Sequence, residues 1–427
     1  MTNRIYGIAI DIGTTNIAAA AVDPEGRILR EAACGNSGAR YGLDVMSRIG
    51  AAAAGKAGEL RDLMQEDIAG LITELLGRGG REVSDGGLQA VAIAGNTAML
   101  HILNGYETAG LGKYPYTPVS VDCEEKCLGE VLETKLSEDL REIPVFILPG
   151  ISAFVGADIV SGLYATEILR RPAEETILFL DLGTNGEMAL KRGRDLTVCS
   201  TAAGPVFEGA GIRCGMRGEP GAICDVLLVP SVKGGTADAG VEARCRTIGG
   251  KPPRGICGSG VLKAVSETVR MKLTDQEGLF REPWFSQGLL LAAGADGGEI
   301  RLYQEDIRAV QLAKAAIRAG AETLPLSCGI TAGDIDEVLV AGNFGSALEL
   351  SGIAPLGLLP AALLSRCRSA GNTALAGAVK LLAQTAGGRR EEALSELSEI
   401  TDHAAQLSLA GRQDFEACYL AMMRMGR

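Results

Sequence analysis

A short pattern occurs twice in this chain, as IAIDIGTTN at residues 8–16 and as LFLDLGTNG at residues 178–186. Each copy is an apolar run with β-strand character that ends in an aspartate and continues into glycine and threonine. Glycine lets the backbone come close to a phosphate, and successive N–H groups in such a turn form a nest for anions. The two copies therefore predict two phosphate-binding hairpins, which limits the folds open to the chain.

The aspartates of these hairpins, Asp11 and Asp181, are expected at strand ends. There they are placed to hold Mg²⁺ through water or to orient an attacking water. A third glycine turn, AGNFG, follows at residues 341–345. Further hydroxyl donors are expected from Thr14, Thr15 and Thr184. The pair of hairpins and the third turn together imply two related domains that close on one nucleotide.

The length and order of the chain support this division. A chain of 427 residues exceeds one ordinary core, which predicts two domains of α/β type. Residues 4–33 read as a β-meander, and residues 176–204 repeat the same order. Charged residues and a proline at 170–172 mark the boundary. We therefore predict a duplicated fold with domains at 1–172 and 173–427.

Helices and further strands are predicted between these motifs. A 3.6-residue apolar period predicts helices at 57–77 and 305–324. Two stretches rich in small residues, 154–169 and 371–382, predict helices that pack closely. Buried strands are expected at 88–96 and 145–151. The prolines of YPYTPVSVD predict an extended segment at 114–122, and residues 336–348 read as strand, glycine turn and helix.

Charge and hydropathy exclude several classes of protein. The formal net charge is −12, which disfavours nucleic acid and anionic membranes as partners. No segment is long and apolar enough to span a bilayer. The opening residues, MTNRIYGIAID, enter a strand at once and leave no room for a signal peptide. We expect a cytoplasmic protein.

The eleven cysteines do not follow a cluster pattern. No two of them are separated by two residues, and only Cys123 and Cys127 are close in sequence. This spacing matches neither a ferredoxin run nor a zinc ribbon. We therefore expect reduced cysteines that pack as small hydrophobic residues, and no iron–sulfur cluster in this chain. A role in a site stays open for three cysteines in or beside glycine-rich segments, which are Cys214, Cys224 and Cys257.

The two hairpins, the third glycine turn and the two small-residue helices, in this order, resemble the ATPase superfamily of actin, sugar kinases and large heat-shock chaperones. The resemblance implies duplicated actin-like, ribonuclease H-like domains with a nucleotide cleft between them, and ATP with Mg²⁺ as ligands. It also implies that the small-residue helices cross at a hinge. The expected phosphate and metal residues are Asp11, Gly13, Thr14, Thr15, Asn16, Asp181, Gly183, Thr184 and Asn185. Gly342, Asn343 and Gly345 are expected at the nucleoside, and Gly204 completes the nucleotide-binding set.

Longer strings narrow the family. AGNTAMLHILNG (94–105), LPGISAFVGADIVSGL (148–163), GPVFEGAGIRCGMRGEPGAI (204–223), ICGSGV (256–261) and VLVAGNFG (338–345) resemble the ATPase part of the reductive activators of corrinoid proteins. Such proteins use ATP to help an electron reach Co(II) cobalamin, which restores Co(I) in a corrinoid protein or a cobalamin-dependent methyltransferase. The resemblance also implies a homodimer. It covers nearly the whole chain.

One departure from that family affects the redox role. The activators usually carry an N-terminal plant-type [2Fe–2S] domain, and this chain begins at the first hairpin. Either a separate ferredoxin-like protein supplies the electrons, or the ATP switch serves another task. Glu208 and Asp158 are candidates for orienting water or sensing the γ-phosphate, and a capping or hinge role is the alternative for both.

Three other functions stay open at this point. A small-molecule kinase of the same superfamily would need a carboxylate base, for which Asp158 or Asp225 could serve. An activator of a radical 2-hydroxyacyl-CoA dehydratase would share the fold and hold a [4Fe–4S] cluster across a dimer. A regulatory module would bind nucleotide without turnover. The glycine-rich stretch at 204–223 reads either as a tightly packed loop or as a mobile one with Arg213 and Arg217 that docks a partner.

Overall fold

The computed structural model describes residues 4–77, 87–133, 135–231, 240–342 and 350–426. Two compact units emerge, which are described separately. The first comprises Met1–Glu174, Lys191–Val198 and Asn372–Gln406. The second comprises Glu175–Leu190, Cys199–Gly371 and Leu407–Arg427. The chain thus returns to the first unit near its end.

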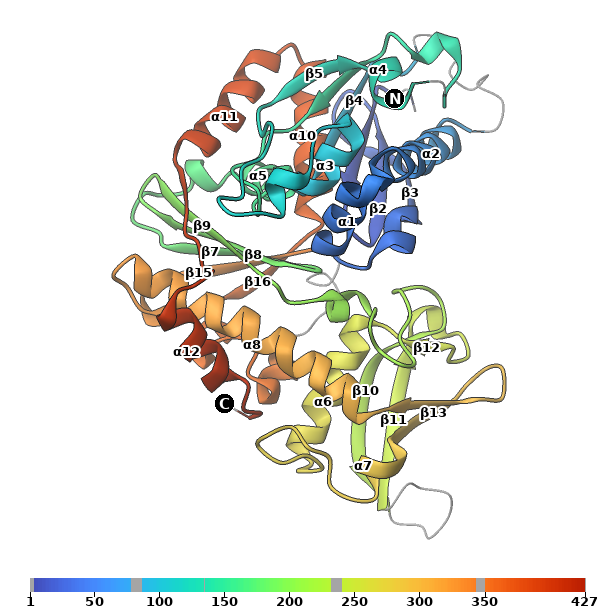
Figure 1. The fold of residues 1–427 in the computed structure, drawn as a ribbon, viewed down its shortest axis with the longest axis vertical. Helices are drawn as coiled ribbons and strands as arrows, with labels where there is room; N and C mark the ends of the chain where they lie inside the picture. Colours follow the sequence, from blue (N-terminus) through green and yellow to red (C-terminus); the bar gives the residue numbers. More distant parts are fainter. Residues whose placement is uncertain (1–3, 78–86, 134, 232–239, 343–349, 427) are drawn as a thin grey trace. The chain divides into compact units, whose positions relative to one another are not determined.

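The first unit is built on a mixed six-stranded sheet (Figure 1). Its strand order is β3–β2–β1–β4–β6–β5. The strands are β1 (Gly7–Ile12), β2 (Asn16–Val22), β3 (Ile28–Gly35), β4 (Ala90–Gly95), β5 (Glu124–Cys127) and β6 (Pro144–Ile147). β1 pairs antiparallel with β2 and parallel with β4. The predicted meander and the predicted strands at 88–96 and 145–151 are confirmed.

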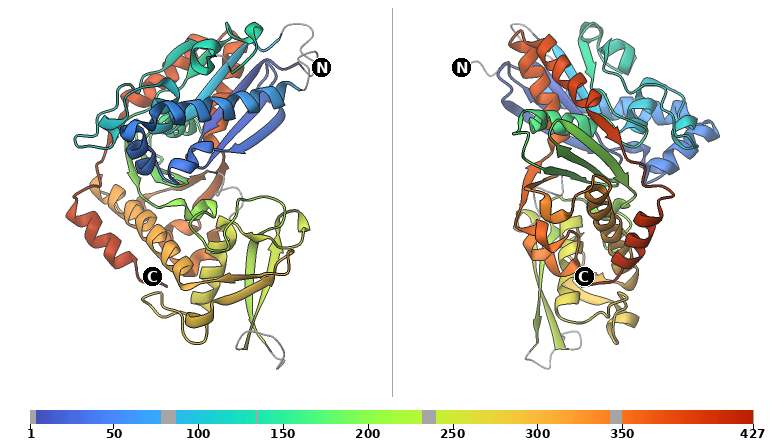
Figure 2. Two further views of the ribbon diagram at one scale, coloured as in Figure 1. Left: turned by 45° about the vertical axis from the view of Figure 1, so that its right-hand side comes forward. Right: turned by 90° about the vertical axis from the view of Figure 1, so that its left-hand side faces the viewer.

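Helices cover this sheet. They are α1 (Val45–Ala51), α2 (Ala57–Leu76), α3 (Thr97–Asn104), α4 (Leu128–Leu132), α5 (Ala157–Ala165), α10 (Thr373–Ala386) and α11 (Arg390–Asp402). α2 packs against β2 and β3, whereas α10 packs against β1 and β4 on the opposite face (Figure 2). Ile8, Ala9 and Ile10 of β1 have no exposed surface, as expected for a strand covered on both faces.

A second six-stranded sheet has the order β16–β15–β7–β8–β9–β17. The strands from residue 177 onward are β7 (Ile177–Leu182), β8 (Gly186–Arg192), β9 (Asp195–Thr201), β10 (Ala222–Pro230), β11 (Val241–Thr247), β12 (Gly255–Ile256), β13 (Leu289–Ala293), β14 (Glu299–Leu302), β15 (Glu337–Ala341), β16 (Cys367–Gly371) and β17 (Ala404–Gln406). β7 pairs parallel with β15, as β1 does with β4. The order β9–β8–β7–β15–β16 repeats β3–β2–β1–β4–β6, so the predicted duplication is confirmed.

The remaining helices belong to the second unit. They are α6 (Gly258–Arg270), α7 (Trp284–Gln287), α8 (Gln304–Ser327), α9 (Ala361–Leu364) and α12 (Gln413–Met422). α6 packs on β10, in the three-stranded sheet β11–β10–β12, and α12 packs on α8. Across the described ranges, no helix combines the length and the apolar character needed to cross a membrane.

Two predicted segments differ from the structure. The helix expected at 154–169 is shorter, because α5 begins only after Gly156 and ends before Glu167, which has a left-handed φ of 52°. A Cβ on Gly156 would lie 2.6 Å from the amide nitrogen of Thr97, so this glycine allows a close approach that a helical turn would not make. The segment predicted to be extended at 114–122 instead begins with a turn, in which Tyr116 has a φ of 60°.

Candidate functional site

The first hairpin connects β1 to β2 through Gly13, Thr14 and Thr15. Its ends are closed by the Gly13 amide, which donates to the Asn16 carbonyl at 2.9 Å. A Cβ on Gly13 would lie 2.8 Å from that same oxygen, so the turn requires glycine. Thr14 is only 5% exposed, and its hydroxyl accepts a hydrogen bond from Asn96 Nδ2 at 3.0 Å. The hairpin is therefore held in one conformation by its own sequence and by the start of α3.

Asp11 lies at the end of β1 beside the start of α10. Asn372 Nδ2 donates to Asp11 Oδ2 at 2.9 Å. The Oδ1 atom of the same asparagine accepts from the Leu375 amide at 2.9 Å and so caps α10. The positive end of the helix dipole is thus directed to the position of this carboxylate.

Asp158, in the first turn of α5, is brought close to Asp11. Burial and then the negative charge of Asp11 raise the pKa of Asp158 to about 7. Its Oδ1 atom also accepts from the Ile159 amide at 2.9 Å. The structure therefore assembles two predicted carboxylates in the first unit, and their proximity raises the pKa of Asp158.

The second hairpin connects β7 to β8. The Gly183 amide donates to the Asn185 carbonyl at 3.0 Å, which closes a turn one residue shorter than the Gly13–Asn16 closure of the first hairpin. Gly342 approaches this hairpin from the end of β15 with a φ of 94°. A Cβ there would lie 2.8 Å from Asp181 Oδ1 and 2.8 Å from the Leu182 carbonyl oxygen. The other two residues of the predicted third turn, Asn343 and Gly345, lie outside the described residues.

Glu208 is joined to the second hairpin by one of its two carboxylate oxygens. The amide and the hydroxyl of Thr184 donate to Glu208 Oε1 at 3.2 and 3.0 Å. The other oxygen, Oε2, is buried and has no hydrogen-bond partner among the residues that the structure describes. A buried carboxylate oxygen without a donor costs free energy, so it is suited to a water molecule or a metal-bound water. Thr184 thus fixes Oε1 of Glu208, whereas Oε2 can accept a hydrogen bond from a water molecule.

The glycine-rich stretch that begins at Gly204 is closely packed. Gly204 has a φ of 79° and precedes the short helix η6 (Pro205–Glu208). A Cβ on Gly209 would lie 2.3 Å from the Met216 carbonyl oxygen, and one on Gly258 would lie 1.8 Å from the Phe207 carbonyl oxygen. These glycines are required because backbone segments touch, so the structure supports the packed interpretation of this stretch.

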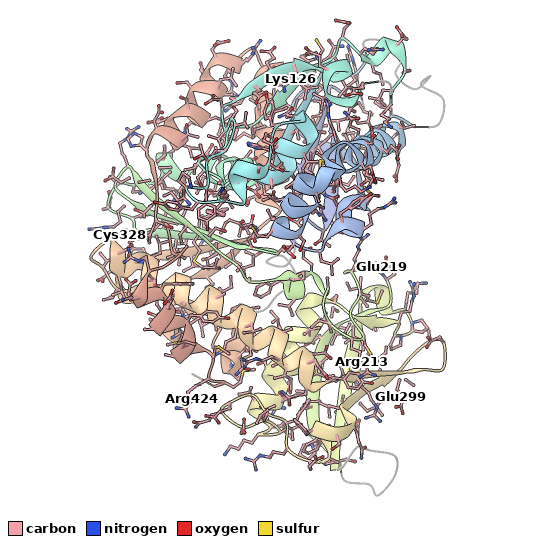
Figure 3. The ribbon with its side chains drawn as sticks, viewed as in Figure 1. Lys126, Arg213, Glu219, Glu299, Cys328 and Arg424 are labelled. Carbon is pink, nitrogen blue, oxygen red and sulfur yellow. The ribbon has the colours of Figure 1, made fainter. Side chains whose placement is uncertain are left out.

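Arg213, labelled in Figure 3, is also held within its own unit. Its guanidinium lies over the Tyr303 ring at 4.1 Å, and its amide donates to Asp306 Oδ1 at 2.9 Å. Asp225, the alternative kinase base, lies on β10, where its Oδ2 atom is 3.6 Å from Arg246 Nη2. Asp225 is therefore engaged with a cation and belongs to a different sheet from the two hairpins.

Asn96 and Asn372 were not among the predicted site residues, although both bind the first hairpin strand. A signal for them exists, because AGNTA occurs at 94–98 and again at 370–374. In both copies a strand ends at glycine, and the asparagine caps the next helix with Oδ1 while its Nδ2 atom donates to Thr14 or Asp11. The repeated AGNTA sequence therefore marks the starts of α3 and α10, and the capping asparagine of each helix also bonds to a residue of the first hairpin motif.

Each unit taken by itself offers carboxylate oxygens of the kind that Mg²⁺ accepts. Mg²⁺ prefers oxygen ligands and usually keeps several waters while it contacts one or two carboxylates and the phosphates. In the first unit, Asp11 supplies a carboxylate at the end of β1. In the second unit, Asp181 supplies one at the end of β7, and Glu208 supplies a buried oxygen that has no donor among the described residues. In the described part of the chain, no group of three or more His, Cys, Asp or Glu side chains is arranged to hold a metal ion.

Comparison with known proteins identifies close relatives. The corrinoid activation enzyme RamQ of Eubacterium limosum is 32% identical over 400 residues, which cover 88% of this chain and 63% of RamQ. The Co(II) methylated amine-specific corrinoid protein reductase of Methanosarcina barkeri is 26% identical over 450 residues, which cover 99% of this chain and 78% of the reductase. This chain therefore spans less than two thirds of the length of RamQ.

A solved structure and two family models agree with these relatives. The structure of a reductive activator for corrinoid, iron–sulfur protein matches with a TM-score of 0.87 and 30% identity, over 100% of this chain and 67% of that one. A model of the RACo middle region matches residues 6–171. A model described as the C-terminal domain of RACo, the ASKHA domain, matches residues 175–426, which is more than half of the chain. The protein therefore belongs to the RACo ASKHA-domain family.

Proposed function

We propose that this protein is an ATP-dependent activator of a corrinoid protein or a cobalamin-dependent methyltransferase. The observation that carries the proposal is the match over the whole chain to a solved reductive activator, with a TM-score of 0.87. The names of two sequence relatives, a corrinoid activation enzyme and a Co(II) corrinoid protein reductase, support the same substrate class.

In this proposal both hairpins bind Mg-ATP. Asp11 and Asp181 hold Mg²⁺ through water, and residues 13–16 and 183–185 contact phosphates. Gly204 and the turn at Gly342, Asn343 and Gly345 contact the rest of the nucleotide. Glu208 orients the attacking water through Oε2, because its other oxygen is already fixed by Thr184. Asp158 lies close to Asp11 and changes the net charge there when it binds or releases a proton.

The energetic task explains why ATP is needed. Reduction of Co(II) to Co(I) has a very low potential, and an axial ligand on cobalt lowers it further. A protein that binds the ligand-free form more tightly shifts the equilibrium by its differential affinity. One electron then passes from a separate low-potential, ferredoxin-like donor, which is oxidised, to Co(II), which is reduced. Slow ATP hydrolysis releases the activated partner, and the activator works as a homodimer in the cytoplasm.

The test is an anaerobic spectroscopic assay. The protein is mixed with a Co(II) corrinoid protein, a low-potential donor and Mg-ATP, and the Co(I) absorption band is followed. We expect an ATP-dependent rise that Asp11→Asn or Asp181→Asn abolishes. Asp195→Asn is the matched control, because Asp195 is an exposed carboxylate at the start of β9, outside both hairpin sequences.

A second measurement separates the parts of the proposal. Mg-ATP binding is measured by calorimetry on the same variants. Intact ATP binding without Co(I) formation, across a set of corrinoid proteins, would overturn the activator role and leave a nucleotide-binding protein with another substrate. Absence of ATP binding would overturn the nucleotide site itself.

A further inference from the structure

Three consecutive backbone carbonyls of the first hairpin are held by two residues that the proposed function does not use. Asn36 Nδ2 donates to the Gly13 carbonyl at 2.9 Å, and the Asn36 amide donates to the Thr15 carbonyl at 2.9 Å. Between them, Arg48 Nη2 donates to the Thr14 carbonyl. We call Asn36 and Arg48 the carbonyl clamp.

The carbonyl clamp is itself rigid. Arg48 has no exposed surface, and Asn36 is 1% exposed. Arg48 Nε donates to the Gly42 carbonyl at 3.1 Å, and Nη1 contacts Met99 Sδ at 3.1 Å. Asn36 Oδ1 accepts from the Gly38 amide at 3.0 Å. Rotation of either side chain would leave buried polar groups without partners, so the clamp has one stable arrangement.

Fixing these carbonyls also fixes the direction of the amides. In a trans peptide unit the N–H group points opposite to the C=O group. The carbonyls of Gly13 and Thr14 point to the clamp, so the amides of Thr14 and Thr15 point away from it. A hairpin of this kind binds an anion only when its N–H groups face the ligand.

The second hairpin is organised differently. There, the amide of Thr184 donates to the Glu208 carboxylate at 3.2 Å. The two hairpins share a sequence pattern, but different neighbouring side chains bond to them. The first is a nest with preset donors, and the second carries a carboxylate.

We propose that Asn36 and Arg48 are positioning residues that preset the amides of the first hairpin for the terminal phosphates of a nucleotide. This inference rests on the proposed nucleotide binding. Neither residue touches the phosphates in this proposal. The clamp lowers the cost of binding because the donors are already oriented before the ligand arrives.

The test compares nucleotides that differ in their phosphates. Calorimetry measures the Kd of Mg-ATP and of AMP, which lacks the β- and γ-phosphates, for the wild type, Arg48→Met and Asn36→Ala. We expect the clamp variants to bind Mg-ATP about tenfold or more weakly, since oriented donors to a charged group contribute that much. The Kd of AMP should change little. The amide hydrogen-exchange rates of residues 12–17 should rise in the same variants.

Arg61→Met is the matched control. Arg61, on α2, also donates to a backbone carbonyl, that of Leu103, at 3.0 Å. It lies in the same unit and should leave both Kd values unchanged. Asn36→Ala removes the side-chain bonds to the Gly13 carbonyl and the Gly38 amide but keeps the backbone bond to the Thr15 carbonyl, so it keeps the test valid if Arg48→Met does not fold.

The outcomes are distinct. Equal weakening of Mg-ATP and AMP would identify a general structural role and overturn the positioning role. Unchanged Mg-ATP affinity in folded clamp variants would overturn the inference alone, because the wild type still binds. If the wild type binds no Mg-ATP, the proposed nucleotide site and the inference both fail.

Discussion

Replacing Gly377 by alanine tests the contact between α5 and α10. A Cβ at this position would lie 2.2 Å from the carbonyl oxygen of Ser161 and 2.3 Å from its hydroxyl oxygen. The same hydroxyl donates to the Ala374 carbonyl at 2.6 Å. The two helices therefore touch through backbone, and the added methyl group has no free space.

The size of the effect follows from this overlap. An ordinary carbon–oxygen contact needs more than 3 Å, so the helices must separate by about 1 Å, and such overpacking costs about 1–3 kcal/mol. Alanine regains up to about 1 kcal/mol through its higher helix propensity. For a unit of this size each lost kcal/mol lowers Tm by about 2–4 °C. We therefore expect Gly377→Ala to lower Tm by several degrees.

Gly70→Ala is the matched control. Gly70 is in the interior of α2, is exposed, and has no neighbouring atom within 4 Å of a built Cβ. The same substitution should there raise stability by about 0.5–1 kcal/mol, because only propensity changes. Thermal unfolding followed by circular dichroism measures both variants under one set of conditions.

The two glycines should move Tm in opposite directions. A rise in Tm for Gly377→Ala similar to that for Gly70→Ala would refute the close helix contact. A second readout is Mg-ATP affinity. Asn372 begins α10 and holds Asp11, so displacement of the helix should weaken nucleotide binding, whereas Gly70→Ala should not affect it.

Three further predictions concern single side chains. Glu208→Gln should slow ATP hydrolysis at least about tenfold with little change in the Kd of Mg-ATP, because a neutral amide orients water poorly; an unchanged turnover number would contradict the water-orienting role. Asn372→Ala should lower the free energy of unfolding by about 1 kcal/mol, measured by urea titration, because α10 loses its cap. It should also weaken Mg-ATP binding, measured by calorimetry. An unchanged free energy of unfolding and an unchanged Kd would exclude the link to Asp11. Burial and then the charge of Arg318 lower the pKa of Lys314 in the folded protein to about 8. The ordinary lysine pKa is about 10.4, so between these two pH values the unfolded state binds more protons than the folded state. The free energy of unfolding therefore rises with pH in this window. Lys314→Met should remove that rise in urea titrations at pH 7.5 and 10, and persistence of the rise would assign it to other groups.

The C-terminal residues of the chain accept hydrogen bonds from side chains of α8. Lys314 Nζ donates to the Arg424 carbonyl at 2.6 Å, and the Arg424 side chain, labelled in Figure 3, pairs with Glu277 at 2.9 Å. Gln311 Nε2 also donates to the Met423 carbonyl at 2.6 Å. Removal of residues 423–427 should therefore destabilise the second unit, because it leaves a buried ammonium without this acceptor. Thermal unfolding with Tm unchanged would contradict that expectation.

The local features of this protein were open to prediction because they depend on a few neighbouring residues. The two strand–Asp–Gly–Thr hairpins follow from apolar strands interrupted by glycine, and their repetition correctly predicted the duplicated sheet. α2 and α8 follow from their apolar period. The non-helical conformation of residues 154–156 could not be predicted in this way. It depends on the close approach of Gly156 to Thr97, which lies about sixty residues away in the sequence and leaves no local pattern.

The tertiary structure alone decided which distant groups serve each hairpin. Asn372 reaches Asp11 across 361 positions of the chain, and residues 372–406 belong to the first unit although they follow the second in sequence. Arg48 reaches Thr14, and Glu208 reaches Thr184, by packing rather than by any sequence period. Hydrogen-bonded turns are encoded locally, whereas the burial of a guanidinium or a carboxylate depends on how whole helices pack on a sheet. The sequence by itself therefore determined that two strand–Asp–Gly–Thr hairpins form, and the packing decided which side chains orient them.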